Sequence, residues 1–363
     1  MSLDSIKALF RPELADLHAY RVPAVPPAVK LDANESPWAL PGEAWEAVVS
    51  AVRSTDLHRY PDGRATALRE ALARTVGGTP DQFVFGNGSD ELIAFLAMAL
   101  SKPREGAERP VALYPEPTFV MYRLSSIGQG WKAVGVALDE EWDLDLGAMS
   151  EALTNERPNV VYYARPNNPT GNAFSRDRLE ALIDAHPDTL HVIDEAYIAF
   201  ADETLSDWCA ERPHCALMGT LSKVGFAAIR LGWLRLHAEL VGELEKVRQP
   251  FNVNGISQKI ATLALTDLAP VLRSQQKAIV AERARLTEAI DAHAWLRPFP
   301  SAANFLLVAV DGDVGALCQA LLGQEIAVRR FGEGYPRLAQ CIRITVGTPE
   351  ENERLIQALG TIA

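Results

Sequence analysis

The chain has 363 residues, 48% of them hydrophobic and 23% charged, and its formal net charge is −12. The composition is ordinary for a globular enzyme or binding protein, and the negative charge argues against a nucleic-acid partner, because phosphate binding requires clustered lysine and arginine. The sequence has no apolar run of membrane-spanning length and no secretory signal at its start, and its four cysteines fit neither a zinc site nor a redox pair, so we expect a cytoplasmic protein without a metal or a membrane partner.

Residues 1–40 contain several prolines and little periodicity, and we predict an irregular arm that packs with the smaller of two domains. Further along, short apolar runs alternate with amphipathic segments that we expect to be helical, such as Asp90–Leu100 and Arg176–Asp184. The predicted strands are Gln82–Phe85, Val111–Tyr114, Trp131–Leu138, Val160–Ala164, His191–Ile193, Ala216–Met218 and Leu231–Leu236. This alternation predicts an α/β fold, with a large domain over residues 41–250 whose mostly parallel sheet is flanked by helices.

The last third of the chain has a different pattern. It is helical in character from Ala238 to about Ala294, with apolar residues at a spacing of three and four. A strand at Asn304–Val310, a helix at Val314–Leu322, a strand at Cys341–Val346 and a last helix from Glu350 are then expected. We predict a smaller α+β domain over residues 251–363.

In an open α/β sheet, ligands bind at the carboxyl ends of the strands, and four segments place polar residues there. The first is a glycine-rich turn at residues 86–90. Gly88 allows a tight turn, Ser89 suits the N-cap of the following helix, and the free amides of a helix N-terminus can bind phosphate. A simple helix cap is the commoner role of such a turn.

The second and third segments follow the strands Val160–Ala164 and His191–Ile193. In the turn after the former, the side-chain amide of Asn168 can donate to a ligand oxygen, although a plain proline-glycine turn is the commoner reading. Asp194 can cap the next helix, or it can face a cationic heterocycle and hold the proton on its nitrogen. Tyr197 would then reach a neighbouring phenolic oxygen.

The fourth segment contains Ser222 and Lys223, with Arg230 seven residues after the lysine. Most lysines are solvated, but this one follows an apolar strand and is flanked by hydroxyl groups. An amine in such a setting can act as a nucleophile, and an arginine suits bidentate contact with phosphate. The four segments together supply what pyridoxal phosphate requires from a protein.

These segments make the sequence similar to the fold-type I pyridoxal-phosphate aminotransferases, and within that group to the histidinol-phosphate aminotransferases. The resemblance covers nearly the whole chain. Beyond the Asn-Pro-Thr-Gly and Ser-Lys segments, it rests on Leu31–Pro37, Arg59–Asp62, Ser301–Phe305, Val328–Gly332 and Cys341–Thr348. One departure is that many relatives place the phosphate arginine eight residues after the lysine, whereas this chain places it seven residues after, a difference that a shorter loop at residues 224–229 can absorb.

The resemblance implies pyridoxal 5'-phosphate as the cofactor. Lys223 would hold it as an imine and later move a proton, and Asp194 would pair with its pyridine nitrogen. Asn168 and Tyr197 would bond its phenolic oxygen, and Phe119 would stack on its ring. The phosphate would be bound by Gly88, Ser89, Asp90, Ser222, Arg230 and, from the neighbouring subunit of a homodimer, Tyr60.

The resemblance also implies the substrates. Arg329, Arg343 and Tyr20 would hold the phosphate of L-histidinol phosphate, with Asn34 also in the substrate site. The same arginines would accept a carboxylate of 2-oxoglutarate, so that the products are imidazole-acetol phosphate and L-glutamate, in histidine biosynthesis. A solvated arginine pair beside a strand is an equally good reading of Arg329 and Arg330.

Two alternatives remain at this stage, and a third can be discounted. An aminotransferase for aromatic or other amino acids would use the same frame, and so would a lyase such as threonine-phosphate decarboxylase, because the cofactor residues do not determine which bond at Cα breaks. A transcription regulator built on such a domain would need a DNA-binding module, for which the acidic chain leaves no room before Asn34.

Overall fold

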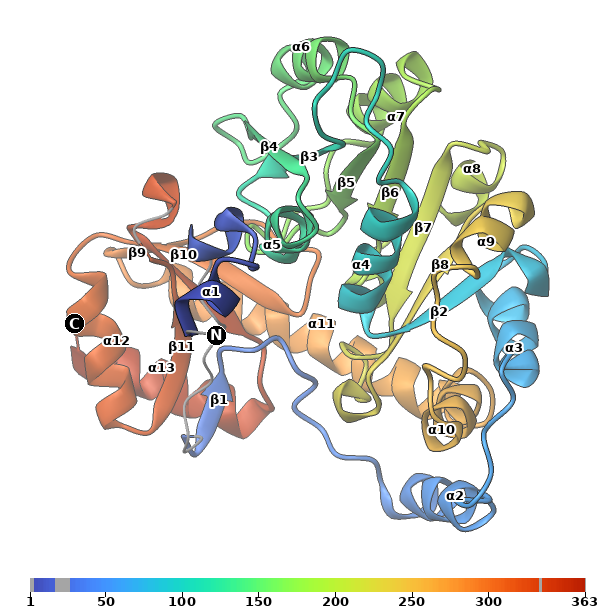
Figure 1. The fold of residues 1–363 in the computed structure, drawn as a ribbon. Helices are drawn as coiled ribbons and strands as arrows, with labels where there is room; N and C mark the ends of the chain where they lie inside the picture. Colours follow the sequence, from blue (N-terminus) through green and yellow to red (C-terminus); the bar gives the residue numbers. More distant parts are fainter. Residues whose placement is uncertain (1–2, 17–26, 333–334, 363) are drawn as a thin grey trace.

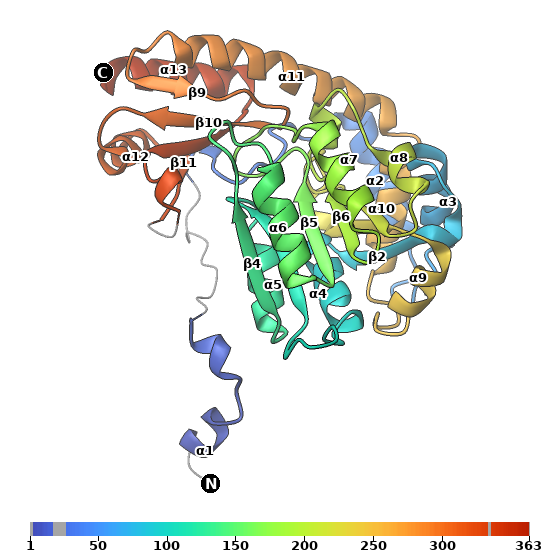
Figure 2. The same cartoon turned by 90° about the horizontal axis from the view of Figure 1, so that it is seen from above.

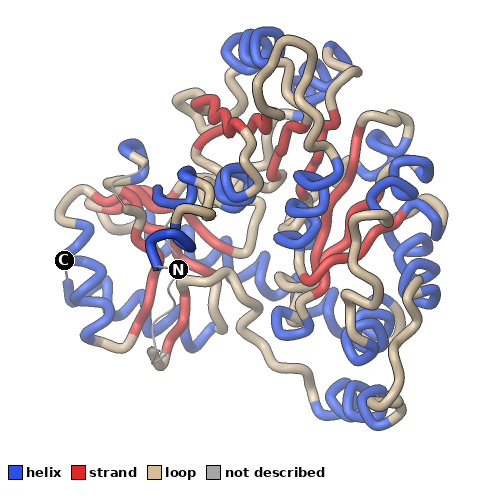
Figure 3. The backbone as a smooth tube through the Cα atoms, in the orientation of Figure 1, coloured by secondary structure: helices blue, strands red, loops and turns tan. Residues whose placement is uncertain are grey.

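The computed structural model describes residues 3–16, 27–332 and 335–362. In this part of the chain, two sheets with their helices lie beside each other, a seven-stranded sheet and a five-stranded sheet (Figures 1 and 3). None of the helices in these residues combines the length and apolarity that crossing a bilayer would need.

The seven-stranded sheet is parallel except for one strand, which is antiparallel to both of its neighbours. Its strands, in spatial order, are β2 (Phe83–Asn87), β8 (Leu231–Arg235), β7 (Cys215–Thr220), β6 (Leu190–Asp194), β5 (Val160–Ala164), β3 (Val111–Glu116) and β4 (Lys132–Ala137). The interior strand β5 is buried at every position. Burial on both faces is typical of a sheet that helices cover on both sides, and it confirms the predicted α/β fold class.

Side chains that alternate along each strand form two separate cores. In β5, Val160 and Tyr162 pack with α4 (Ser89–Ala99), α5 (Met121–Gly128) and α9 (Ala238–Leu244). On the other face, Val161 and Tyr163 pack with a second group of helices. This group comprises α2 (Gly42–Arg53), α3 (Thr66–Val76), α6 (Leu146–Glu156), α7 (Arg176–Ala185), α8 (Ser206–Ala210) and α10 (Gly255–Leu265).

The five-stranded sheet includes a strand from the N-terminal segment. Its spatial order is β1 (Val29–Leu31), β11 (Ile326–Arg330), β12 (Cys341–Thr345), β10 (Phe305–Val310) and β9 (Leu296–Pro298). It packs against α12 (Val314–Gly323), α13 (Pro349–Ile362) and the end of α11 (Ala269–Asp291). The long helix α11 also contacts α10, so it runs along both units (Figure 2).

The predicted strands and helices are present, with ends that differ by one or two residues, but several short elements were not predicted. The segment expected to be an irregular arm contains α1 (Leu3–Lys7), the 3-10 helix η1 (Pro12–Asp16) and β1. β9 and β11 were also missed, because β9 has three residues and β11 ends in two exposed arginines.

Candidate active site

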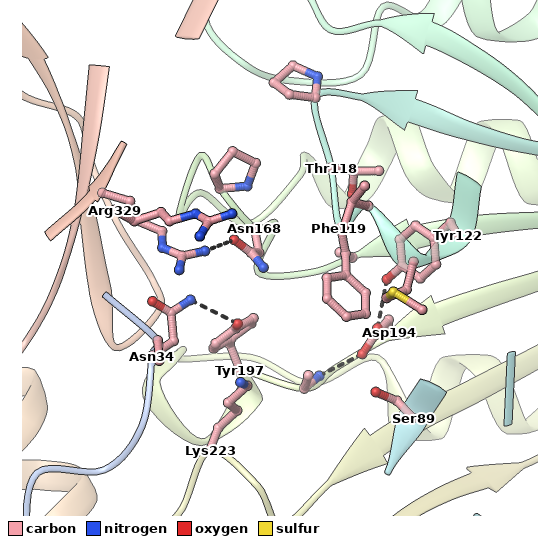
Figure 4. Close-up of a pocket in the computed structure, with 18 of the residues that line it drawn as sticks. Asn34, Ser89, Thr118, Phe119, Tyr122, Asn168, Asp194, Tyr197, Lys223 and Arg329 are labelled. Carbon is pink, nitrogen blue, oxygen red and sulfur yellow. Dashed lines mark hydrogen bonds between the residues drawn. The ribbon is translucent and has the colours of Figure 1, made fainter. Parts of the chain in front are cut away.

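A cavity of about 650 Å³ lies between the two units, at the carboxyl ends of the parallel strands. Residues from both units line it, and Figure 4 shows how their side chains converge. Most of the predicted site residues lie in its wall: Asn34, Gly88, Ser89, Asp90, Phe119, Asn168, Asp194, Tyr197, Ser222, Lys223, Arg230, Arg329 and Arg343.

One corner of the cavity is the N-terminus of α4. The structure corrects the predicted cap: Gly88 is the N-cap, and Ser89 is already the first helical residue. Gly88 has a φ of +81°, a backbone conformation that favours glycine. A Cβ there would also lie 2.6 Å from a guanidinium nitrogen of Arg230, so the side chain of any other residue would clash. The Gly88 amide donates to the carbonyl of Gly86 (2.9 Å), whereas the amides of Ser89 and Asp90 have no acceptor within the helix.

Arg230 reaches this corner from the start of β8. Its guanidinium lies 3.4 Å from the Asp90 carboxylate and 3.5 Å from the Ser222 hydroxyl. A Cβ on Gly232 would lie 2.6 Å from the backbone of Gly88 and Ser89, so glycine allows this close approach of strand and turn. The shorter spacing between lysine and arginine therefore still brings Arg230 to the helix N-terminus.

Asp194 ends β6, lines the same cavity and is only 3% exposed. Burial raises the pKa of its carboxyl to about 6, against the opposing effect of two hydrogen bonds. These come from the Tyr122 hydroxyl (2.7 Å) and the amide of Ala196 (3.0 Å). A carboxylate held in this way is suited to face a cation in the cavity.

Tyr122 was not predicted as part of the site. It is fully buried in α5, its ring stacks on Tyr162 with centroids 4.7 Å apart, and Phe119 packs edge-on against it at 5.6 Å. In the sequence it looks like any other aromatic residue on the apolar side of a helix. Only the fold reveals that its hydroxyl meets Asp194.

Lys223 and Tyr197 also line the cavity and lie beside each other (Figure 4). The amine of Lys223 is 5.6 Å from the centroid of the Tyr197 ring. The side-chain amide of Asn34 donates a hydrogen bond to the Tyr197 hydroxyl (3.0 Å). Lys223 and Tyr197 are therefore neighbours, although they follow different strands of the sheet, β7 and β6.

Asn168 and Arg343 connect the two units at the other end. Arg343 donates to the side-chain oxygen of Asn168 (2.5 Å) and to the carbonyl of Asp32 (2.7 Å). Arg329 is paired with Arg343 across β11 and β12 and also lines the cavity. Arg330 lies instead beside Gly315, so the two adjacent arginines have different surroundings.

Among the described residues that were predicted for the site, Tyr60 does not line this cavity. Tyr60 is 82% exposed and stacks on Phe251, with ring centroids 4.6 Å apart. Tyr20 lies outside the described residues. Within the ranges that the structure describes, no group of three or more His, Cys, Asp or Glu side chains could hold a metal ion.

The arrangement has a defined chemical capacity. It combines an amine, a buried carboxylate, amides at a helix N-terminus and guanidinium groups at both ends of one cavity. Such a cavity can bind a phosphorylated ligand at the helix and hold a second anion at Arg329 and Arg343. The amine and the carboxylate lie between these two anion sites.

Comparison with known proteins agrees with this geometry. Residues 26–359 match the model of the family Aminotransferase class I and II. The histidinol-phosphate aminotransferase of Chromobacterium violaceum is 40% identical over 98% of this chain and 98% of its own length, and that of Methylibium petroleiphilum is 41% identical over 96% and 93%.

Among solved structures, the histidinol-phosphate aminotransferase of Sinorhizobium meliloti, in complex with pyridoxal-5'-phosphate, superimposes with a TM-score of 0.86 and 25% identity. The alignment covers 98% of this chain and 99% of that one. With a family model matched over most of its length and relatives at this level of identity, the chain belongs to the class I and II aminotransferases.

Proposed function

We propose that the protein transfers the amino group of L-histidinol phosphate to 2-oxoglutarate and forms imidazole-acetol phosphate and L-glutamate. The observation that carries this proposal is that one cavity is lined by Lys223 and Asp194 and, from the smaller unit, by Arg329 and Arg343. The names of the relatives at 40% and 41% identity support the choice of substrate. We place the reaction in histidine biosynthesis in the cytoplasm.

The cofactor that fits this cavity is pyridoxal 5'-phosphate. The fit can be judged from Asp194, because burying a carboxylate is costly unless a cation or donors compensate for it. A protonated ring nitrogen facing Asp194 would be such a cation. When bound, the cofactor supplies an electron sink for the pair left at the substrate Cα. The other residues that would hold it are Gly88, Ser89, Asp90, Ser222 and Arg230 at the phosphate, Phe119 at the ring, and Asn168 and Tyr197 at the phenolic oxygen.

Lys223 has two tasks in this proposal. Its amine would hold the cofactor, and when free it would carry a proton away from the substrate Cα. Asp194 stays ionised and keeps the proton on the ring nitrogen. Tyr197, whose ring centroid is 5.6 Å from the lysine amine, donates to the phenolic oxygen beside it.

Arg329 and Arg343 bind the anionic end of the substrate, together with Tyr20. Guanidinium groups make bidentate, charge-assisted contacts with phosphate and carboxylate. The same pair can therefore hold the phosphate of the amino donor in one half-reaction and a carboxylate of the oxo acid in the other. Arg343 already contacts Asn168, so the anion site adjoins the proposed cofactor site.

We also propose that the protein is a homodimer with shared active sites. Tyr60 is 82% exposed and is displayed with Phe251 on the surface. An exposed phenol is available to another subunit, where it would contact the cofactor phosphate. Exposed apolar side chains on the same part of the chain, Trp45 and Leu57, would be covered by the same contact.

Product analysis tests the proposed reaction. The protein, loaded with pyridoxal phosphate, is incubated with L-histidinol phosphate and 2-oxoglutarate, and glutamate and imidazole-acetol phosphate are measured together. Equal amounts of both are expected. A protein that forms no glutamate but releases carbon dioxide from L-threonine phosphate would instead be a decarboxylase.

A further inference from the structure

Asn34 has a position that its assignment to the substrate site does not explain. It is 1% exposed, and it adopts a φ of +55°, a left-handed conformation that asparagine tolerates better than most residues. It follows β1 of the five-stranded sheet, yet its side chain reaches Tyr197 of the larger unit. Asn34 therefore joins the two units beside the cavity.

Every polar group of Asn34 has a partner. Its backbone amide donates to the Thr345 hydroxyl oxygen (2.9 Å), and its backbone carbonyl accepts from the side chain of Asn304 (3.1 Å). Its side-chain oxygen accepts from the Thr345 hydroxyl (3.2 Å), and its side-chain NH2 donates to Tyr197 (3.0 Å). Because the hydrogen bonds of Asn34 all run to other residues of the protein, Asn34 is well suited to position another residue.

The directions of these hydrogen bonds can be followed from one residue to the next. The Thr345 hydroxyl gives its hydrogen to the oxygen of the Asn34 amide, which places the NH2 of that amide toward Tyr197. The Tyr197 hydroxyl accepts this bond through a lone pair, so its own hydrogen must point elsewhere. The amine of Lys223 lies 5.6 Å from the centroid of the Tyr197 ring and is itself a donor when protonated, so it does not then accept this hydrogen, which is free to point into the cavity.

The ring of Tyr197 is held firmly, so its hydroxyl hydrogen is the part that the neighbours can adjust. Tyr197 is 5% exposed and packs edge-on against Phe305 with ring centroids 5.2 Å apart. Rotation of the hydroxyl about its C–O bond is nevertheless cheap. An amide that presents NH2 selects one of the available directions for the hydrogen.

We propose that Asn34 is a positioning residue, which directs the hydroxyl hydrogen of Tyr197 into the cavity, where it donates to the phenolic oxygen of the cofactor. The proposal rests on the proposed function, because it assumes that pyridoxal phosphate binds there. Thr345 takes part by orienting the Asn34 amide. The five-stranded sheet thereby influences how the larger unit binds the cofactor.

Asn34→Gly tests this role, because glycine accepts the φ of +55° and removes only the amide. We measure the dissociation constant of pyridoxal phosphate for the cofactor-free protein and the pH midpoint of the visible absorbance of the bound cofactor. A hydrogen bond contributes enough to weaken binding roughly three- to tenfold when it is lost. Because a donor favours the charged form of the oxygen that it bonds, its loss should raise the pH midpoint by about 0.5–1 unit.

The double variant with Tyr197→Phe separates positioning from a general structural effect. If Asn34 acts through the Tyr197 hydroxyl, Asn34→Gly should add nothing to Tyr197→Phe. Affinity for inorganic phosphate, which is expected to bind at the α4 corner, should be unchanged in all variants. Effects that add in the double variant, or an Asn34→Gly protein with the wild-type midpoint, would overturn the proposal.

A second pair of variants serves if Asn34→Gly does not fold. Thr345→Val removes the hydroxyl that orients the amide, and Thr345→Ser keeps it. The valine variant should show the raised midpoint and the serine variant the wild-type midpoint, and equal midpoints in the two would contradict the proposal. If the wild-type protein binds no pyridoxal phosphate, the proposed function itself fails; if all variants bind it with one midpoint, only the role of Asn34 fails.

Discussion

The hydroxyl of Tyr122 donates a hydrogen bond of 2.7 Å to the carboxylate of Asp194, and both side chains are buried in the larger unit. The bond favours the ionised form of Asp194, whereas burial favours the protonated form. Burial has the larger effect, since the pKa of Asp194 is raised to about 6. The cofactor-free protein thus keeps a carboxylate that destabilises it and that a bound cation would compensate.

This relationship predicts how stability depends on pH. The pKa of Asp194 is raised from 3.8 to about 6 in the folded protein. Between these two values the folded state holds a proton that the unfolded chain has released, so the free energy of unfolding falls as the pH rises through this window. The proton on Asp194 contributes on the order of 3 kcal/mol to the free energy of unfolding at low pH. This contribution is lost above pH 6.

Asp194→Asn should abolish the fall in the free energy of unfolding between about pH 4 and pH 6, because an amide does not titrate. The variant should be more stable than the wild type in its cofactor-free form at pH 7, and the difference should shrink toward pH 4; urea unfolding at several pH values measures it. Turnover should nevertheless fall by several powers of ten, about 1.4 kcal/mol of barrier for each, because an amide cannot hold the ring proton. Near-normal turnover would mean that Asp194 serves only the structure.

Glu195 provides the matched control for this prediction. It is also buried, its pKa is also raised by burial, and its carboxylate accepts from Thr204 and the amide of Leu205 rather than facing the cavity. Glu195→Gln should alter stability but keep turnover within about threefold, the range expected for a residue outside the site.

Lys223 is predicted to be the covalent anchor. Borohydride reduction of the loaded protein, followed by peptide mapping, should place the label on Lys223. Lys223→Ala should lose this label and its turnover while retaining some affinity for the cofactor through the phosphate site. Lys246→Ala, at an exposed lysine paired with Glu243, should behave as the wild type. A label on any other lysine would disprove the assignment.

Tyr60 should act in the active site of the other subunit. Neither Lys223→Ala nor Tyr60→Ala protein alone has an intact site, but a mixed dimer would have both lesions in one site and none in the other. Mixing the two variants should therefore restore activity. If subunits exchange, as a mass measurement can show, and activity does not return, Tyr60 belongs to the site of its own chain or to no site.

Arg329 and Arg330 form a matched pair for the anion site. Arg329 lines the cavity, whereas Arg330 lies beside Gly315. Arg329→Ala should lower kcat/KM for histidinol phosphate more than for phenylalanine, because a phosphate dianion uses the guanidinium more fully than a carboxylate. Arg330→Ala should leave the ratio of the two constants unchanged. Equal losses for both donors in the Arg329 variant would remove the argument for a phosphate site.

The sequence predicts the fold of the larger unit well, because the strands of the seven-stranded sheet are apolar over most of their length. The segment Val160–Ala164 is buried at all five positions, and its predicted ends agree with the structure. β9 and β11 could not be predicted in the same way. β9 has three residues, and the arginines of β11 break the alternation of apolar and polar side chains.

The cavity was predictable where a motif follows a strand, as at Asp194, Lys223 and Asn168. It was not predictable where a contact joins distant segments. Tyr122 and Asp194 are 72 residues apart in the chain, and their meeting depends on how α5 packs on the sheet. The N-cap of α4 was misplaced by one residue for a local reason, since the φ of +81° at Gly88 cannot be read from its neighbours.

The most direct test of the proposed function is the half-reaction with single amino donors. The loaded protein is mixed with histidinol phosphate, histidinol or phenylalanine, and the loss of cofactor absorbance gives kcat/KM for each. The kcat/KM for histidinol phosphate should exceed the other two by about a hundredfold or more, because histidinol offers no anion to Arg329 and Arg343, and phenylalanine offers only a carboxylate, which uses their charge less fully than a phosphate dianion. If phenylalanine reacts as efficiently as histidinol phosphate, the protein is an aminotransferase of broader or aromatic specificity, and the histidinol-phosphate assignment is wrong.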